Sequence, residues 1–295
     1  MQPSRSLAAA LEPFAGQVYF SPECHRAYEA LGFAPSPGAA GAVALPDGPA
    51  YFTSRGSLMG QVHGEVVAAA FGVFNPAVVV PAVAHGWSLT DAATICRART
   101  EGAGAQLERL LGGHPPGIER AIELLARAVD DLRPEGKPLF AGVVAQGETG
   151  EALVDAWRLA DALRDYRGDV HLNVWTTAGF DGAEIGLVTE LYWGLPMRTY
   201  VRTRAWSPDD LDAATERLEA RGLVDGGQLT PAGREARERI ETETDAGCAP
   251  IVARLGDELE EVVAVLSEWS RAIQAGGGYP AQGPHDLARL GERRR

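Results

Sequence analysis

The chain has 295 residues, with 40 acidic and 27 basic side chains and a formal charge of −13. This length suffices for a large core and for two domains or one large domain. The negative charge argues against a broad surface for nucleic acid or for an anionic membrane. The three cysteines, at 24, 96 and 248, are odd in number and far apart. They predict neither a disulfide framework nor a thiolate zinc site, and they favour a reducing cytoplasm.

The first 56 residues are predicted to form two short helices within 6–33, a loop or loose hairpin over 34–49 and a strand at Ala50–Thr53. Ser21 and Pro22 begin the second helix, because serine is a good N-cap and proline suits the first helical position. The order of helix, loop and strand suggests a degenerate winged helix. No basic region followed by an apolar run opens the chain, so we expect no secretory signal.

Residues 57–168 are predicted to form a helical domain. Helices are expected over 58–73, from 76 to about 87, and over 90–111, 118–132 and 151–166, with a short one beginning near Lys137. The longest apolar stretch, 66–84, is interrupted by Asn75-Pro76, which is typical of a helix start. It therefore predicts two buried helices and no membrane span.

Residues 169–245 are predicted to form a winged-helix-like domain. Residues 171–177 fit either a strand or a helix, and the spacing of their apolar side chains favours a helix. Further helices are expected over 181–193 and 207–222, followed by a hairpin over 223–230 and a helix that begins at Thr230-Pro231. Residues 246–275 extend this as a C-terminal helix, with breaks at Gly247 and Gly256, and the tail 276–295 is expected to be mostly disordered. The fold class is therefore mainly α with small β-hairpins: a winged helix plus a helical bundle.

The helix over 207–222 occupies the place of a DNA-recognition helix but has an unsuitable charge. In DNA readers of this type the recognition helix enters the major groove and the hairpin contacts phosphate. Here the helix carries five acids against two bases, and the turn 225–228 has no lysine or arginine. Carboxylates repel the phosphate backbone, so nucleic acid is an unlikely partner.

The string Arg167-Gly168-Asp169-Val170-His171 is expected to join two helices and to carry the candidate catalytic residues. Glycine permits a sharp turn, and aspartate is well placed to cap the next helix. Arg167, Asp169 and His171 could face a cavity, with His171 as a general acid or base held by Asp169. The alternative is a structural corner in which the three side chains only satisfy one another.

The other candidate ligand-binding residues are polar and aromatic side chains elsewhere on helices: His63, Glu65, Phe74, Asn75, Trp175, Tyr192 and Trp193. The aromatic ones suit a flat apolar ligand, or else a plain core or interface. His63 and Glu65 do not share a helix face, so no metal site is expected. The basic run over 198–204 suits phosphate, a carboxylated ligand or the acids of the following helix, and the last is preferred.

Several strings occur in a characteristic order: Phe74-Asn75-Pro76, then 163–171, 178–184, 218–224 and 229–234. Over residues 58–256 the chain resembles an actinobacterial family of helix-turn-helix-related proteins, and its Leu-Thr-Pro-Ala-Gly-Arg string resembles MarR-type regulators. The resemblance implies a winged-helix core with added helices and no assigned activity.

We interpret the sequence as a cytoplasmic small-molecule-binding protein or cofactor-independent enzyme, with a role in secondary metabolism. His171, Asp169 and Arg167 would line its site, without cofactor, metal or membrane. One alternative is a DNA-binding transcriptional regulator. Another is a homodimeric scaffold that uses the apolar side of the helix over 258–269 as its interface.

Overall fold

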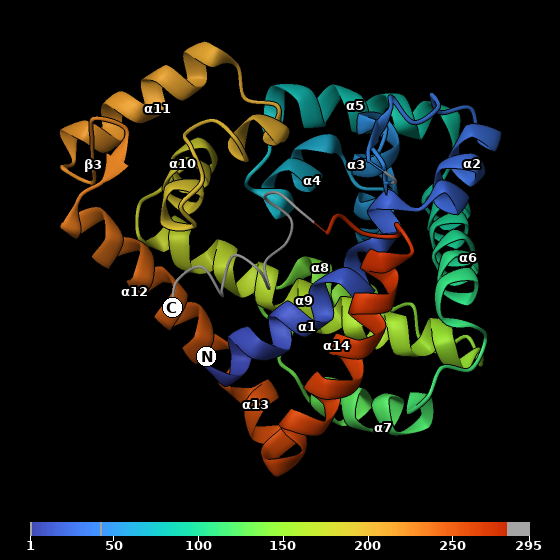
Figure 1. The fold of residues 1–295 in the computed structure, drawn as a ribbon. Helices are drawn as coiled ribbons and strands as arrows, with labels where there is room; N and C mark the ends of the chain where they lie inside the picture. The colour runs from blue at the N-terminus through green and yellow to red at the C-terminus, as the bar shows by residue number, and fades with distance from the viewer. Residues whose placement is uncertain (1, 42, 282–295) are drawn as a thin grey trace.

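The computed structural model describes residues 2–41 and 43–281, which are mostly helical (Figure 1). In the first half the elements are α1 (Pro3–Gly16), η1 (Gln17–Phe20), α2 (Pro22–Ala30), β1 (Ala39–Ala40), β2 (Val43–Ala44), α3 (Gly48–Gly56), η2 (Ser57–Met59), α4 (Gly64–Phe71), α5 (Pro76–Leu89), α6 (Ala92–Leu111), α7 (Ile118–Val129) and α8 (Pro138–Val144). In the second half they are α9 (Ala152–Thr177), α10 (Gly182–Tyr192), η3 (Val201–Arg204), α11 (Pro208–Ala220), β3 (Val224–Asp225), β4 (Gln228–Leu229), α12 (Pro231–Gly247), α13 (Ala249–Leu255), η4 (Gly256–Glu258) and α14 (Leu259–Ala275). Each pair of strands forms an antiparallel hairpin. The prediction of a mainly α fold with small hairpins is confirmed.

The largest hydrophobic cluster joins the two ends of the described chain. It draws on α1, α6, α7, the first two thirds of α9, and α14. Figure 1 shows α1 and α14 crossing the body together, and the Phe14 and Trp269 rings lie 5.2 Å apart between them. Because Val262, Leu266 and Trp269 are buried in this cluster, the apolar side of α14 packs within the chain and is not the exposed dimer seam that the sequence suggested.

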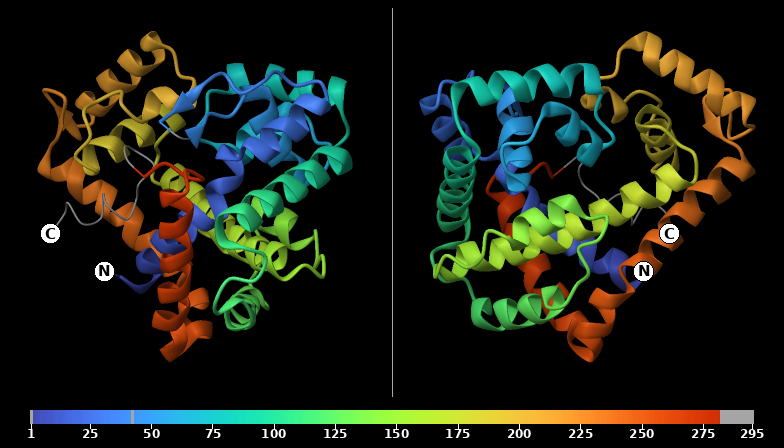
Figure 2. Two further views of the ribbon diagram at one scale, coloured as in Figure 1. Left: turned by 45° about the vertical axis from the view of Figure 1, so that its right-hand side comes forward. Right: turned by 180° about the vertical axis from the view of Figure 1, so that it is seen from behind.

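A second cluster holds α10, α11, α12 and the β3–β4 hairpin together on one side of the molecule (Figure 2). Its elements follow the order expected of a winged helix. We call residues 182–247 the winged-helix segment and the rest of the described chain the body. Ser207 and Asp210 form a capping box at the start of α11, and the Thr230 side chain caps α12. Gly226 and Gly227 both have positive φ, as the tight turn between paired strands requires. These local signals are strong, and the predicted elements of this segment are confirmed.

A third cluster combines aliphatic and aromatic side chains of α3, α4, α5 and the connection between α4 and α5. Phe52, Phe71 and Phe74 are buried together, with Leu139 of α8 against them. The predicted strand at Ala50–Thr53 is wrong, because this segment is the middle of α3. The Asp47 side chain accepts the Ala50 N–H at 3.1 Å and starts the helix, which overrides the β propensity of tyrosine, phenylalanine and threonine.

Two other boundaries differ from the sequence prediction, and one agrees with it. The expected helix over 58–73 is interrupted after η2, where Gly60 has a φ of 83°, and resumes as α4 at Gly64. The Asn75 side chain caps α5 as predicted. In the expected tail Tyr279 is buried in the largest cluster, so residues 276–281 do not fit a disordered tail, and 282–295 lie outside the described residues.

The most consequential difference concerns α9, which runs without interruption from Ala152 to Thr177. The string over 167–171 is therefore not a connection between two helices, and the proposed domain boundary between 168 and 169 falls inside a helix. Asp169 does not cap the segment that follows it. Its Oδ2 atom accepts the N–H groups of Leu139 and Phe140, at 3.1 and 3.0 Å, and so caps α8 from outside.

No described helix is long and apolar enough to cross a membrane.

Candidate functional site

A cavity of about 790 Å³ lies where the three hydrophobic clusters meet. Its walls come from α1, η1, α3, α4, α8, α9, α10, η3, α12 and α13. Aromatic and aliphatic side chains such as Phe71, Phe74, Trp175 and Ile185 form much of the lining, together with several arginines. The volume and the mixture of apolar walls with a few polar groups are those of a small-molecule site.

Six of the candidate residues line this cavity, and four do not. Arg167, Asp169, His171, Phe74, Trp175 and Trp193 are all in its wall. His63 and Glu65 are exposed on the first turn of α4 or just before it, and Asn75 caps α5 and donates a hydrogen bond to Asp210. Tyr192 is buried behind the wall, where its hydroxyl donates to Glu238 and its ring packs on Arg237.

His171 belongs to a charged network between α9 and α12. Its Nδ1 atom lies 3.1 Å from the Thr244 hydroxyl, so threonine and not Asp169 orients the ring. Glu241 bridges Arg167 and Arg237, at 2.9 and 2.6 Å. Burial and the nearby Arg237 lower the pKa of His171 to about 3, so the imidazole is neutral at pH 7. Burial opposes ionisation of Glu241, but Arg237 and Arg167 outweigh it and hold its pKa well below the usual range.

Asp169 faces a different part of the cavity wall, two residues away on the same helix. Its Oδ2 atom caps α8, while its Oδ1 atom is buried without a hydrogen-bond partner among the described residues. Burial raises the pKa of Asp169 to about 7 despite the two backbone N–H groups, which act in the opposite direction. This carboxyl group can therefore exchange a proton near neutral pH.

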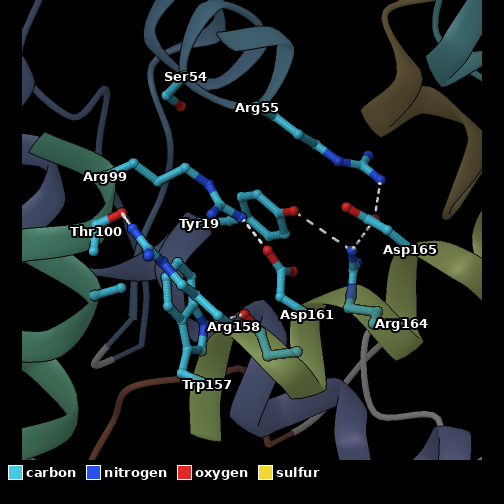
Figure 3. Close-up of polar contacts among 12 residues, drawn as sticks. Tyr19, Ser54, Arg55, Arg99, Thr100, Trp157, Arg158, Asp161, Arg164 and Asp165 are labelled. Carbon is cyan, nitrogen blue, oxygen red and sulfur yellow. Dashed lines mark hydrogen bonds and ion pairs between the residues drawn. The ribbon is translucent and has the colours of Figure 1, made fainter. Parts of the chain in front are cut away.

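Asp169 is the last of three buried aspartates spaced four residues apart along α9, after Asp161 and Asp165. Asp161 pairs with Arg99 at 2.7 Å, and Asp165 pairs with Arg55 at 2.8 Å (Figure 3). Of these four paired residues, Arg55 and Asp165 reach the cavity, whereas Arg99 and Asp161 lie behind it. The i, i+4 spacing of the aspartates was visible in the sequence and predicts a shared helix face. The arginines come from α3 and α6, and no local pattern pointed to them.

The three arginines of the basic run over 198–204 have three different positions. Arg198 pairs with Asp212 of α11, as the preferred interpretation expected. Arg202 is exposed and does not reach the cavity. Arg204 turns inward and lines the cavity, with its guanidinium 4.8 Å from the Phe74 ring.

The outer surface of α11 is acidic. Asp209, Asp212, Glu216 and Glu219 are all exposed. The two arginines near the end of this helix are neutralised by the start of α10: Arg217 pairs with Asp181 and Glu184, and Arg221 pairs with Glu184 at 3.2 Å. The folded chain therefore presents carboxylates where a DNA reader presents cations.

Among the described residues, no group of three or more histidine, cysteine, aspartate or glutamate side chains is arranged to hold a metal ion.

The chain matches no curated protein and no solved structure. A family model described as a helix-turn-helix family matches residues 4–280, which includes every element that lines the cavity. The chain therefore belongs to this helix-turn-helix family.

Proposed function

We propose that this protein binds a small organic molecule in its central cavity and uses the helix-turn-helix scaffold as part of the wall. The observation that carries the proposal is the cavity itself, about 790 Å³ in volume and lined from both the body and the winged-helix segment. Aromatic walls favour a flat or apolar ligand body, and the polar groups fix its orientation.

The polar groups also support chemistry on such a ligand without a cofactor. His171 was the sequence candidate for proton transfer, but a pKa of about 3 makes it a weak base at neutral pH. Asp169, with a pKa of about 7 and a free Oδ1 atom, is better matched to that task. We therefore assign proton transfer to Asp169, and to His171 and Arg167 a role in shaping and polarising the wall.

The experiment is a thermal-shift screen of a metabolite library, accompanied by native mass spectrometry of the purified chain. Ala8 lines the cavity from α1, so Ala8→Trp should fill part of it. Compounds that stabilise the wild type should bind Ala8→Trp at least about tenfold more weakly, because the indole occupies their volume. Ala213→Trp, on the exposed side of α11, is the matched control and should bind as the wild type does.

Two results would contradict the proposal. In the first, the compounds bind Ala8→Trp as tightly as the wild type, which would place their site elsewhere. In the second, no compound binds and the native mass corresponds to the chain alone.

The second candidate function is transcriptional regulation through DNA binding, and membership of a helix-turn-helix family favours it. We place it second because the ion pairs of Arg217 and Arg221 leave the exposed face of α11 acidic. A role in secondary metabolism stays part of this proposal. The homodimer proposed from the apolar side of the helix over 258–269 loses that basis, because Val262, Leu266 and Trp269 are buried within the chain.

A further inference from the structure

The arginines that line the cavity differ in how their charge is balanced. Five of the six form ion pairs with carboxylates: Arg5 with Glu238 and Asp245, Arg55 with Asp165, Arg164 with Glu12, Arg167 with Glu241 and Asp245, and Arg237 with Glu241. Arg204 has no carboxylate partner among the described residues. It is therefore the one lining arginine whose charge the described part of the chain leaves unbalanced.

The surroundings of Arg204 hold its guanidinium in place without using all its donors. The Arg204 carbonyl accepts the Asn75 N–H at 3.0 Å, which anchors η3 to the start of α5. The guanidinium lies 4.8 Å from the Phe74 ring and 4.4 Å from the Tyr200 ring, and it also contacts the Tyr200 hydroxyl. Its Nε atom is buried and has no hydrogen-bond partner. A guanidinium packed on aromatic rings keeps its in-plane N–H groups available for a planar, two-oxygen acceptor.

The rest of the cavity offers this cation little competition from unpaired carboxylates. The one lining carboxyl group outside the ion pairs is that of Asp169, and burial raises its pKa to about 7, so much of it is neutral near that pH. Phe71, Phe74 and Trp175 form apolar wall in the same cavity. An anion that entered here would lose water and gain a fixed, charged donor, which strengthens the pairing.

We infer that Arg204 binds the carboxylate of the ligand, and that an apolar, preferably aromatic, body of the same molecule packs among Phe71, Phe74 and Trp175. One unbalanced guanidinium matches one negative charge, which favours a carboxylate over a phosphate dianion. This inference rests on the proposed function, because it names the class of molecule that the cavity takes.

The test compares carboxylic acids with their neutral amides of the same shape. The probes are 2-naphthoate, 4-phenylbutyrate and decanoate, each with its carboxamide, titrated calorimetrically into the full chain at low salt. At least one acid should bind the wild type about tenfold or more tightly than its amide, which is the range of a charge-assisted hydrogen bond. Arg204→Gln should lose this preference. Arg202→Gln removes an exposed arginine two residues away and should keep it.

A variant that does not fold is recognised by its circular dichroism spectrum. If Arg204→Gln does not fold, Arg204→Lys tests whether Arg204 binds the carboxylate, because lysine keeps the charge but lacks the planar pair of donors. We expect it to bind the acid at least about threefold more weakly, with amide binding unchanged. Acid and amide affinities that fall together, or an unchanged acid affinity, would overturn the assignment.

The remaining outcomes separate this inference from the proposed function. Amides that bind as tightly as acids, or an acid preference that survives in Arg204→Gln, would refute the role of Arg204 and leave a ligand-binding cavity. If no acid binds, the carboxylate assignment is wrong. The library screen with Ala8→Trp then decides independently whether the cavity binds anything.

Discussion

The carboxyl group of Asp169 is held between two opposing influences. Two backbone N–H groups at the start of α8 favour its ionised form, whereas burial favours the neutral form and dominates. The free Oδ1 atom is then the position where a proton resides, because Oδ2 is already occupied as an acceptor. A single side chain thus both caps a helix and holds a buried titratable group in the wall of the cavity.

This arrangement predicts an unusual dependence of stability on pH. The pKa of Asp169 in the folded chain, about 7, exceeds the value of about 3.9 expected when unfolded. The folded state therefore binds the proton more tightly, and this contribution is lost as the pH rises from about 4 to about 7. In urea denaturation, the stability of the wild type relative to Asp169→Asn should fall by about 2 kcal/mol between pH 5 and pH 8.

Asparagine is the appropriate replacement, because its side-chain oxygen can still accept from Leu139 and Phe140 and it does not titrate. Asp225→Asn, at an exposed position in the β3–β4 hairpin, is the control and should follow the wild type at every pH. Parallel profiles for the wild type and Asp169→Asn would show that Asp169 has an ordinary pKa.

At the scale of single elements, α9 shows which features of a helix the sequence predicts and which it does not. Helices that begin with a clear cap, such as those after Asn75, Ser207 and Thr230, were predicted because the signal lies within a few residues. Gly168 was interpreted as a turn, because glycine permits the backbone to turn sharply. The helix continues because its buried face packs on both sides of that point, with Trp157 before it and Val170 and Trp175 after it.

A glycine substitution separates the two interpretations of this segment. Gly168 is exposed, and a Cβ placed on it meets no atom within 4 Å. Gly168→Ala should therefore stabilise the protein by up to about 1 kcal/mol in urea denaturation, as alanine does inside a helix. Destabilisation by this change would instead indicate a turn at 168.

Gly72, unlike Gly168, leaves no room for a Cβ atom. It ends α4 with a φ of 58°, and a Cβ there would lie 2.1 Å from Leu172 Cδ1. Gly72→Ala should destabilise the protein, because both the backbone and the neighbouring side chain would have to move.

The sequence indicated individual residues of the candidate site, including Phe74 and Trp193, but it did not indicate which side chains they contact. Arg167, Asp169 and His171 stand close together in the sequence, and all three reach the cavity. Their actual partners, such as Glu241 and Thr244, come from α12, and chain topology decides which residues of α12 face α9. The role of Arg204 was equally hidden, since only the fold distinguishes it from Arg198 and Arg202.

At the scale of the whole molecule, the distribution of charge is the ground on which we rank the two candidate functions. Asp209, Glu216 and Glu219 are exposed on α11 and form no ion pair within the described residues. A phosphate backbone approaching this face meets like charge, and non-specific affinity depends on neutralising phosphate.

The wild type should therefore show no binding to a labelled duplex of random sequence at low salt, measured by fluorescence anisotropy. The triple variant Asp209→Lys, Glu216→Lys, Glu219→Lys reverses the charge of the face and should gain salt-sensitive binding. Tight, salt-sensitive binding by the wild type would restore DNA recognition as the leading function.

The course of α9 through the molecule has a mechanical consequence. Its first two thirds belong to the core of the body and Trp175, near its end, to that of the winged-helix segment, while Arg5 of α1 fastens α12 from the other side. Because α9 is continuous, a rotation of one of these parts against the other would have to bend this helix. A ligand bound as we propose would contact both parts together. We therefore expect its binding to stabilise the native state against heat more than to change the shape of the protein.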